Sequence, residues 1–518
     1  MADAHALALD RAVVVIGAGT MGAGIAEVAA VAGHRVYLCD TSEAALDRGR
    51  AQIRASLDRR VAKGRASAED AASAFARVIA AGPSAPLQGV GLVIEAIVEN
   101  LDIKVAALTE MARRVDDDAI LSTNTSSLSV TALAARLPAP ERVAGLHFFN
   151  PATILPLVEV VRGHATDPAL VETLVATARA WKKTPVVCQS TPGFIVNRVA
   201  RPFYGEALRL LLEQQATPET VDAVMRECGG FRMGPCELMD LIGHDVNFAV
   251  TRSVWQAFFH DPRYQPSLVQ QQLVDAGWLG RKSGRGFYDY RDDAPRPDVR
   301  DLQGPAPARV RIEGALGPAQ GLVAPLEQAG LNVEKTEGAG LLRVDGVALA
   351  LTDGRSAGPR SQALGEPVVL FDLALDYAAS KRIALSAAEG TPADVIAQAA
   401  GLFTALGKQV SLLGDAAGLA VSRTVAMLVN EAADAVQQGI ASEADIDAAM
   451  TGGGELPDRA AGLGPARGAG LCRRRADPSV AGLRGRPLSR LALAAGACAR
   501  GVAWLSSSAW PRRRAWRW

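Results

Sequence analysis

His147 and Glu159 are the residues whose types and spacing best suit proton transfer. His147 lies in Leu146-His-Phe-Phe-Asn-Pro151 and is one of six histidines in the chain, and Glu159 lies in Leu157-Val-Glu-Val160. Both segments are strand-like, and two adjacent strand ends can bring an imidazole within hydrogen-bonding reach of a carboxylate. Imidazole titrates at about pH 6.5 in model peptides, which suits a general base. From spacing alone, a satisfied core histidine and a surface glutamate are the alternative.

Two further polar segments could bind a ligand. Ser122-Thr-Asn-Thr-Ser-Ser127 follows an apolar strand that ends at Leu121, and open α/β sheets bind ligands at such strand ends. A turn with a helix N-cap is the alternative. Asn197, in Thr191-Pro-Gly-Phe-Ile-Val-Asn-Arg198, lies among apolar helix positions where an amide needs a hydrogen-bond partner. Its alternative is a structural amide that bridges helices.

A glycine-rich segment near the N-terminus predicts a dinucleotide site. Gly17, Gly19 and Gly22 have the spacing G-x-G-x-x-G between an apolar strand, residues 12–16, and a helix-compatible stretch. These glycines permit a tight turn, close approach of a pyrophosphate, and close packing of helix on strand. Asp40 closes the next strand, where it would accept hydrogen bonds from a ribose diol and repel a 2′-phosphate. The pattern favours NAD over NADP; an ordinary glycine-rich turn is the alternative.

A nicotinamide cofactor and a histidine base together suit the oxidation of a secondary alcohol. The base removes the hydroxyl proton while a hydride leaves the carbon for nicotinamide. A carboxylate behind the imidazole would fix its tautomer and stabilise the imidazolium.

Alternating strands and helices must position these groups. Short apolar runs separated by helical patterns lie at residues 12–16, 35–40, 91–95, 119–121 and 143–146. This alternation predicts a parallel α/β sheet. After Thr191 the pattern changes to long helix-period segments, including residues 194–215 and 218–227, which predict a separate all-helical domain reaching Tyr290.

The later part of the chain repeats the earlier part. Val310-Arg-Ile-Glu-Gly314 and Leu331-Asn-Val333 indicate a second α/β region, whose glycine spacing does not match the dinucleotide fingerprint, so we expect no cofactor there. Gly193-Phe-Ile-Val-Asn-Arg198 resembles Gly418-Leu-Ala-Val-Ser-Arg423, and a second pair of segments matches at the same offset. The helical domain is therefore predicted to be present twice.

The predicted organisation has six segments. They are an NAD-binding Rossmann domain at 1–190, a helical substrate and dimerisation domain at 191–290, a linker at 291–308, a reduced Rossmann-like domain at 309–415, the start of a second helical repeat at 416–453, and a tail at 454–518.

Length and composition narrow the class of protein. A chain of 518 residues with 49% apolar residues predicts two to four domains. No apolar run reaches the roughly 18–20 residues of a membrane helix, and the start lacks signal-peptide features. The six cysteines show neither C-x-x-C nor metal-ligand spacing. We therefore expect a cytoplasmic protein with reduced thiols, no membrane association and no metal.

In order along the chain, these motifs closely resemble the 3-hydroxyacyl-CoA dehydrogenase family from about Val13 to Tyr290. The most specific segments are Gly17-Ala-Gly-Thr-Met-Gly22, Glu95-Ala-Ile-Val-Glu-Asn-Leu101, Asn124-Thr-Ser-Ser-Leu128, Gly145-Leu-His-Phe-Phe-Asn-Pro151, Thr191-Pro-Gly-Phe-Ile-Val-Asn-Arg198 and Gly280-Arg-Lys-Ser-Gly-Arg-Gly-Phe-Tyr288. The longer layout resembles a bacterial long form of the family. Members of that form occur in phenylacetate degradation and act on 3-hydroxyadipyl- or 3-hydroxybutyryl-CoA.

The resemblance implies NAD-dependent oxidation of (3S)-3-hydroxyacyl-CoA to 3-oxoacyl-CoA, with His147 as general base and Glu159 as its partner. Ser126 would bind the reacting oxygen near nicotinamide, and Asn197 would help to hold the substrate. The positions that match NAD contacts are Gly17, Gly19, Thr20, Met21, Gly22, Asp40, Glu99, Lys104, Ser126, Asn150 and, more distantly, Lys282. Ser56 and Lys63 match positions that touch coenzyme A, although a solvated helix lysine is the alternative for Lys63.

The second repeat lacks the matching chemistry. Ser422 replaces Asn197 there, and no His–Glu pair accompanies it. We expect this repeat to be structural, packing on the first or forming a pseudo-dimer within one chain; a homodimer through the helical domains is the alternative.

The tail has the composition of an out-of-frame GC-rich gene. From Gly454 to Trp518 it holds 13 Arg, no Lys, three acidic residues and four of the chain's seven Trp. Basic tails can bind nucleic acid, but the second repeat fails abruptly after Gly453. The residues after that point are Gly454-Glu-Leu-Pro-Asp-Arg-Ala-Ala-Gly-Leu-Gly464. One permitted choice of codons for them, read one base later, spells Ala-Asn-Tyr-Pro-Ile-Gly-Pro-Leu-Ala-Trp. That sequence matches the motif missing from the second repeat. We expect a frameshift and no nucleic-acid role.

Rival interpretations differ in their catalytic residues. Dehydrogenases of the β-hydroxyacid type share this architecture but rely on a lysine in the helical domain. A non-enzymatic descendant predicts a damaged site, yet suitable residues fill all four catalytic positions. No hydratase-like module fits the sequence, which argues against a hydratase–dehydrogenase fusion.

Resequencing the gene tests the frameshift. We expect codons after Gly453 that restore the repeat motif when read one base later. An intact frame whose shifted codons do not spell that motif would contradict the hypothesis.

Overall fold

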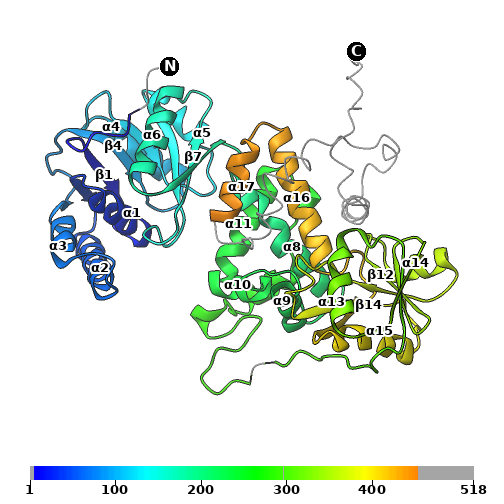
Figure 1. Cartoon of the computed structure of the whole chain (residues 1–518). Helices are drawn as coiled ribbons and strands as arrows, with labels where there is room; N and C mark the ends of the chain where they lie inside the picture. Colours follow the sequence, from blue (N-terminus) through cyan, green and yellow to red (C-terminus); the bar gives the residue numbers. More distant parts are fainter. Residues whose placement is uncertain (1–4, 296, 453–518) are drawn as a thin grey trace, which may run out of the picture. The chain divides into compact units, whose positions relative to one another are not determined.

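The computed structural model describes residues 5–295 and 297–452, and the predicted tail at 454–518 lies outside them (Figure 1). The chain divides into two compact units. The first runs to Arg198 and includes a later segment that starts at Asp434, and the second runs from Val199 to Ala433. The first unit contains the glycine-rich loop and the His147–Glu159 pair.

An eight-stranded sheet forms the centre of the first unit, in the order β3-β2-β1-β4-β5-β6-β7-β8. Its strands are β1 (Ala12–Ile16), β2 (Val36–Cys39), β3 (Val78–Ala81), β4 (Val90–Glu95), β5 (Ile120–Thr123), β6 (Val143–Phe148), β7 (Leu157–Arg162) and β8 (Thr184–Gln189). Neighbouring strands are parallel except β6 and β7. The order β3-β2-β1-β4-β5-β6 is that of a doubly wound dinucleotide-binding sheet, so the predicted α/β fold is confirmed.

Helices cover both faces of this sheet (Figure 1). They are α1 (Thr20–Val31), α2 (Glu43–Ala62), α3 (Ala68–Ala76), α4 (Leu101–Ala112), α5 (Val130–Ala134), the 3-10 helix η1 (Pro140–Arg142) and α6 (Pro168–Ala180). Apolar residues of α1, α2 and α6 pack on one face, and those of α4 and α5 on the other. Because helices bury both faces of the sheet, the strand sequences are nearly continuous apolar runs, which is typical of parallel sheets.

The strands extend slightly beyond the sequence expectation. The run predicted at 143–146 is observed as β6, Val143–Phe148, so His147 lies inside a strand rather than after its end. The reason is the antiparallel neighbour β7, whose ladder pairs with β6 as far as Phe148. This pairing places His147 directly opposite Glu159.

The second unit begins with helices, as the sequence predicts. They are α8 (Arg201–Leu212), α9 (Pro218–Glu227), α10 (Pro235–Ile242), α11 (His244–Ala257), η2 (Pro262–Tyr264), α12 (Leu268–Asp275) and η3 (Arg281–Ser283). The helical stretch expected at 194–215 is split into a short α7 (Val196–Val199) and α8. Proline occupies the first turn of α8, where its missing N–H costs nothing, so a new helix starts there.

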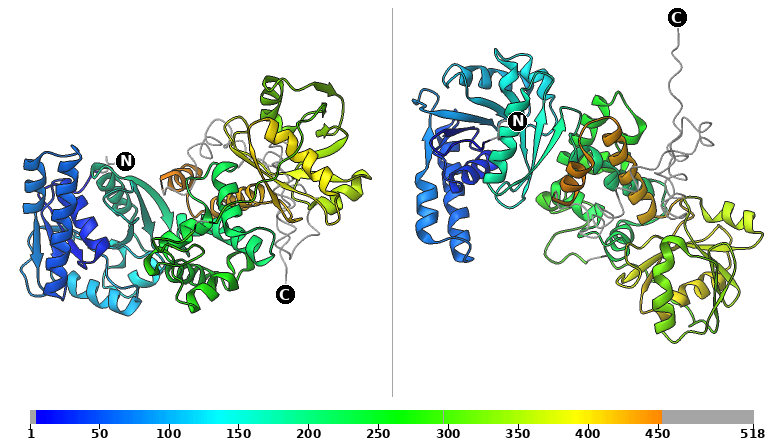
Figure 2. Two further views of the ribbon diagram at one scale, coloured as in Figure 1. Left: turned by 90° about the horizontal axis from the view of Figure 1, so that it is seen from below. Right: turned by 45° about the horizontal axis from the view of Figure 1, so that its top comes forward.

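A seven-stranded mixed sheet completes the second unit, in the order β10-β9-β11-β12-β13-β14-β15. Its strands are β9 (Val310–Glu313), β10 (Val333–Thr336), β11 (Leu341–Val344), β12 (Val347–Leu351), β13 (Val368–Phe371), β14 (Arg382–Ser386) and β15 (Gln409–Leu413). Helices η4 (Gly317–Leu322), α13 (Val323–Gln328), α14 (Ala357–Leu364) and α15 (Ala393–Ala405) connect them, with α15 along the sheet (Figure 2). Helices α16 (Val421–Gln437) and α17 (Glu443–Gly452) follow.

The internal repeat is longer than the helical segments that reveal it in the sequence. Strands β13 and β14 and helix α15 each begin 225 residues after β6, β7 and α6, respectively. The antiparallel register is also the same, with Leu370 opposite Ser386 as Gly145 is opposite Val161. The duplication therefore includes the strand pair that carries His147 and Glu159.

Asp372 occupies the position in this repeat that corresponds to His147. Its backbone N–H donates to the carbonyl of Ala384, the counterpart of Glu159. The buried Asp372 carboxylate accepts hydrogen bonds from Ala420, Val421 and Ser422 N–H at 2.7–2.9 Å. Burial raises the pKa of Asp372 to about 6, against the opposing effect of these donors. At neutral pH the ionised carboxylate thus anchors the start of α16.

Replacement of this anchor tests its importance to the second unit. Asp372→Ala leaves four buried N–H groups, those of Leu373, Ala420, Val421 and Ser422, without this acceptor. We expect the loss to cost about 2–4 kcal/mol of stability. Thermal unfolding and amide exchange at Ala420–Ser422 measure the loss. Asp394→Ala, on the exposed start of α15, is the control. Unchanged exchange in Asp372→Ala would contradict the anchoring role.

Candidate active site

His147 and Glu159 form a buried hydrogen-bonded pair. Nδ1 of His147 lies 2.6 Å from Oε2 of Glu159, and their side chains are 7% and 1% exposed. Their strands hold them directly across the ladder from one another. Because the carboxylate accepts a hydrogen bond from Nδ1–H, the pair favours the tautomer whose Nε2 carries the free lone pair. This is the nitrogen that can take a proton from a ligand.

The second oxygen of Glu159 is held by the chain that leads into α7. Ile195 and Val196 N–H both donate to Oε1, each at 3.0 Å. These two donors occupy Oε1, so Oε2 is left to bind the imidazole. The rings of Phe149 and Phe194 flank His147 at centroid distances of 4.6 and 5.8 Å. The imidazole therefore has a fixed orientation in a largely apolar surrounding.

Asn197 and Ser126 lie on the segments that support this pair. Asn197 is half-buried in α7, next to Val196, one of the two donors to Glu159. Ser126 lies in the loop after β5, the strand beside β6. In the same loop Asn124 Oδ1 accepts a hydrogen bond of 2.7 Å from Phe148 N–H, directly after His147. Asn124 belongs to the polar run noted in the sequence, but its role in positioning was missed.

Glu99 orders the loop that carries Ser126. Its Oε1 accepts hydrogen bonds from the hydroxyls of Thr125 and Ser127 at 2.5 and 2.8 Å and from Ser126 N–H at 3.1 Å. Burial opposes ionisation, but these hydroxyls and the Lys104 charge lower the pKa of Glu99. The ionised Glu99 carboxylate can thus fix the loop that follows the end of β5.

Lys104 is part of a buried ion-pair cluster. Its ammonium lies 2.7 Å from Glu95 and 3.2 Å from Glu99, and its side chain is only 1% exposed. Lys104 is among the NAD contacts that the family resemblance implies, whereas Glu95 is not among the predicted site residues. The charge pattern of Glu95, Glu99 and Lys104 would have been the signal for this cluster.

The glycine-rich loop has the geometry that a dinucleotide requires. Gly17 has φ of +104°, and a Cβ there would lie 2.6 Å from the carbonyl oxygen of Ala96. A Cβ on Gly22 would lie 1.8 Å from the Gly17 carbonyl oxygen, whereas one on Gly19 would meet nothing within 4 Å. Thus Gly17 and Gly22 allow the tight turn, and the space beside Gly19 stays open for a ligand.

The surroundings of this loop also fit NAD. Helix α1 begins at Thr20, followed by Met21, and has neither a side-chain cap nor an acidic residue in its first turn. Its N-terminal N–H groups can therefore receive a pyrophosphate. Asp40 accepts hydrogen bonds of 2.9 Å from Ala18 and Ser42 N–H, which fixes the carboxylate beside the loop. The residues present thus suit the predicted cofactor.

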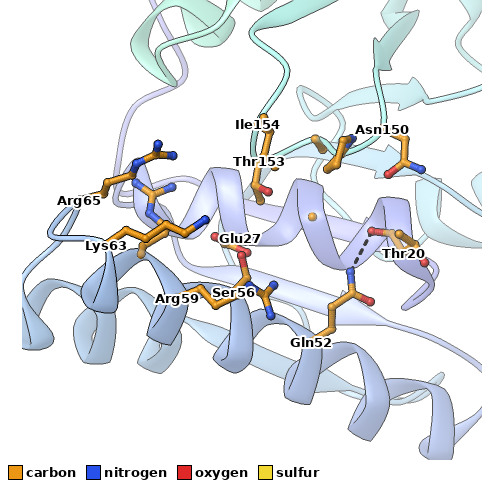
Figure 3. Close-up of a pocket in the computed structure, with 14 residues that line it drawn as sticks. Thr20, Glu27, Gln52, Ser56, Arg59, Lys63, Arg65, Asn150, Thr153 and Ile154 are labelled. Atoms are coloured by element: carbon orange, nitrogen blue, oxygen red, sulfur yellow. Dashed lines mark hydrogen bonds between the residues drawn. The ribbon is translucent and has the colours of Figure 1, made fainter. Parts of the chain in front are cut away.

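A pocket of about 380 Å³ lies between α1, α2 and the loop that follows β6 (Figure 3). The residues that line it are Thr20, Gly24, Glu27, Gln52, Ser56, Arg59, Arg60, Lys63, Arg65, Asn150, Pro151, Ala152, Thr153 and Ile154. It brings together Ser56, Lys63 and Asn150, which the sequence assigned to coenzyme A and NAD. Figure 3 shows Arg59, Lys63 and Arg65 at one end and Thr20 and Asn150 at the other.

Several lining residues were missed from the sequence. Ser56, Arg59, Arg60 and Lys63 recur at spacings of three to four along α2 and its end, so they share one face of that helix. That spacing would have indicated a basic patch. Glu27 had no comparable signal, because a lone acid among the apolar residues of α1 is evident only once the fold is known.

Lys282 belongs to the second unit, outside the segments described above. It pairs with Asp245 at 2.5 Å, and this pair lowers the pKa of Asp245 against the effect of partial burial. Lys282 and the glycine-rich loop belong to different units, and the predicted role of Lys282 at NAD stays a prediction.

Two further observations concern the cysteines and the apolar character of the helices. The cysteines at 39, 188, 228 and 236 are buried free thiols, and no cluster of three or more metal-ligating side chains occurs in the described ranges. Among residues 5–295 and 297–452, none of the helices combines the length and apolar character needed to cross a membrane.

Three family models match the chain. The 3-hydroxyacyl-CoA dehydrogenase NAD-binding domain matches residues 12–191. The C-terminal domain of the same family matches 193–290 and 418–480, and the 3-hydroxybutyryl-CoA dehydrogenase reduced Rossmann-fold domain matches 349–416. The second match to the C-terminal domain agrees with the internal repeat.

Similar proteins are dehydrogenases of the same kind. 3-Hydroxyadipyl-CoA dehydrogenase of Escherichia coli K12 is 46% identical over 447 residues, covering 86% of this chain and 89% of that protein. 3-Hydroxybutyryl-CoA dehydrogenase of Bradyrhizobium diazoefficiens is 40% identical, covering 56% and 99%. A crystal structure of 3-hydroxybutyryl-CoA dehydrogenase from Escherichia coli K12 has a TM-score of 0.79 at 45% identity, covering 87% and 90%.

The carboxylate of Asp40 gives a direct test of the cofactor site. Asp40→Ala removes the acceptor for the ribose hydroxyls, so we expect NAD binding to weaken about tenfold, corresponding to one charged hydrogen bond. It also removes the repulsion of a 2′-phosphate, so the preference for NAD over NADP should shrink. Fluorescence titration with NADH and NADPH measures both effects. Asp47→Ala, an exposed position on α2, is the control. An unchanged NADH affinity in Asp40→Ala would refute the assignment.

Proposed function

Because this chain belongs to the 3-hydroxyacyl-CoA dehydrogenase family, we propose that it oxidises (3S)-3-hydroxyacyl-CoA to 3-oxoacyl-CoA with NAD. The single observation that carries the mechanism is the buried His147–Glu159 pair, 2.6 Å apart, in the same unit as a glycine-rich loop suited to NAD. Relatives over most of the chain are named for this reaction class and for 3-hydroxyadipyl-CoA or 3-hydroxybutyryl-CoA.

His147 is the base in this proposal. Glu159 holds Nδ1–H, so Nε2 takes the proton of the substrate 3-hydroxyl. The Ile195 and Val196 N–H groups hold Glu159 beside the ring, where its carboxylate stabilises the imidazolium that forms. When bound, NAD would accept the hydride from the substrate carbon that carries this hydroxyl. In the reductive direction, His147 returns the proton as a general acid.

The neighbouring loops hold the reactants. We propose that Ser126 and Asn197 bind the reacting oxygen and fix its distance from Nε2. Glu99 supports Ser126 through the hydrogen bonds that order its loop. The backbone from Gly17 to Gly22 and the start of α1 receive the pyrophosphate, and Asp40 receives the adenosine ribose.

The basic pocket suits the long arm of an acyl-CoA substrate. Coenzyme A carries phosphates, and guanidinium and ammonium groups bind phosphate. Arg59, Lys63 and Arg65 lie at one end of the pocket, and Thr20 and Asn150 lie at the other (Figure 3). We therefore place the nucleotide end of the substrate at the basic end, with Ser56 and Lys63 as contacts, and the acyl end towards the start of α1.

We propose a catabolic role in fatty-acid or phenylacetate-type degradation, in the cytoplasm. The family match over both helical repeats supports a pseudo-dimer within one chain or a homodimer through the helical domains. The Ser422 repeat has Asp372 and Ala384 in place of His147 and Glu159, so it supplies structure rather than chemistry.

Replacement of the base tests the proposal. The assay follows NADH oxidation with acetoacetyl-CoA, 3-oxoadipyl-CoA and longer 3-oxoacyl-CoAs. His147→Ala should lower kcat by about 10²–10⁴-fold, the usual contribution of a positioned acid–base group, with NADH affinity unchanged. His164→Ala, at an exposed position, is the matched control.

The outcomes separate two failures. Folded wild-type protein that is inactive with all these substrates would refute the enzymatic function. Full activity in His147→Ala would refute the assigned base and leave the dehydrogenase function in place.

A further inference from the structure

The basic end of the pocket holds four cations without carboxylate partners among the described residues. They are Arg59, Arg60, Lys63 and Arg65, and none forms an ion pair within that part of the chain. Four unpaired cations around one cavity repel one another, and the cost falls when an anionic group enters. The cluster is therefore available to a phosphate-bearing ligand.

Glu27 lies at the centre of this arrangement. It is the single acid among the described residues that line the pocket, and it is 2% exposed. In Figure 3 its side chain lies beside Ser56, with Lys63 and Arg65 on one side of it and Gln52 and Thr20 on the other. Burial raises the pKa of Glu27, while Ser56 and the charges of Arg60, Arg59 and Lys183 lower it. Positive charges from α2 and from Lys183 thus both act on the Glu27 carboxylate.

Lys183 connects Glu27 to the opposite wall of the pocket. Its ammonium donates to the carbonyl oxygen of Ala152 and, at 2.9 Å, to that of Leu155. These carbonyls belong to the loop that supplies residues 150–154 of the lining. Burial and the charge of Arg60 lower the pKa of Lys183, and Glu27 raises it. Without Glu27, the ammonium that holds this wall would face uncompensated repulsion from the wall on α2.

Glu27 also leaves the cations free for a ligand. Its Oε1 is buried without a hydrogen-bond partner in the described part of the chain. It therefore acts on Arg59, Arg60 and Lys183 through space, without occupying their N–H groups in fixed ion pairs. A carboxylate that paired tightly with Arg60 would compete with a phosphate.

We propose that Glu27 is a positioning residue that holds the two walls of the pocket at the spacing needed for the nucleotide end of the acyl-CoA substrate. The inference rests on the proposed function, because it takes the substrate to be a coenzyme A thioester. Glu27 touches neither the reacting carbon nor the base in this account. Its contribution is confined to the affinity for the phosphate-bearing arm.

Two substrates with the same acyl group distinguish an effect of Glu27 on the nucleotide arm from an effect on the whole active site. Acetoacetyl-CoA carries the phosphates, and acetoacetyl-N-acetylcysteamine has the same thioester without a nucleotide. For Glu27→Gln, we expect KM for acetoacetyl-CoA to rise about tenfold, which corresponds to the loss of one partly buried charge interaction. KM for the N-acetylcysteamine thioester and kcat with both substrates should stay within about twofold of wild type.

A neighbouring carboxylate provides the control. Asp58 precedes Arg59 on α2, is exposed and does not line the pocket. Asp58→Asn removes the same charge from the same helix, so its KM for acetoacetyl-CoA should stay near that of wild type. Glu27→Asp keeps the charge but withdraws it by one methylene. It should raise KM for acetoacetyl-CoA by about threefold without affecting the short thioester, and it gives the test if Glu27→Gln does not fold.

Each outcome decides between the proposals. Inactive wild-type enzyme with both substrates overturns the proposed function itself. An active wild type, together with unchanged KM values in Glu27→Gln, overturns the role of Glu27. An equal rise in KM for both thioesters also overturns it, since a structural role or an effect on NAD would not distinguish the two arms.

Discussion

One buried carboxylate, Glu159, joins the His147 imidazole to the backbone at the start of α7. Oε2 holds Nδ1 of His147, and Oε1 receives two N–H groups at the start of α7. The antiparallel step between β6 and β7 makes this possible, because it places the two side chains directly opposite each other. Any movement of α7 would change the support of the imidazole, so the position of Asn197 is linked to the orientation of the proposed base.

The second repeat keeps the strand arrangement but lacks the His–Glu pair. Strands β13 and β14 keep the register of β6 and β7, but Asp372 and Ala384 replace His147 and Glu159. Asp372 accepts N–H groups at the start of α16, as Glu159 does at α7. A carboxylate at a helix start is therefore common to both repeats. Among the described residues of the two repeats, an imidazole lies beside this carboxylate in the first repeat alone.

Much of this was predictable from sequence, and the exceptions have physical causes. The glycine spacing and Asp40 predict the cofactor loop because backbone sterics allow few alternatives at Gly17 and Gly22. His147 and Glu159 were identifiable by type, but their register depends on a strand pairing that no local pattern specifies. Glu27 was invisible, since its significance depends on cations from another helix and on Lys183 beyond β7. Phe194 to Gln215 was expected as a continuous helical stretch, but α8 restarts at Arg201.

In the proposed site, Glu159 fixes the His147 tautomer with Nδ1 protonated and Nε2 free. Nitrogen NMR of the ¹⁵N-histidine-labelled protein reads this directly, with the His147 signals assigned by their loss in His147→Gln. At a pH where the imidazole is neutral, we predict a protonated Nδ1 and an unprotonated Nε2 for His147 in the wild type. A proton on Nε2 instead would contradict the account, because the nitrogen assigned to the substrate could not accept one.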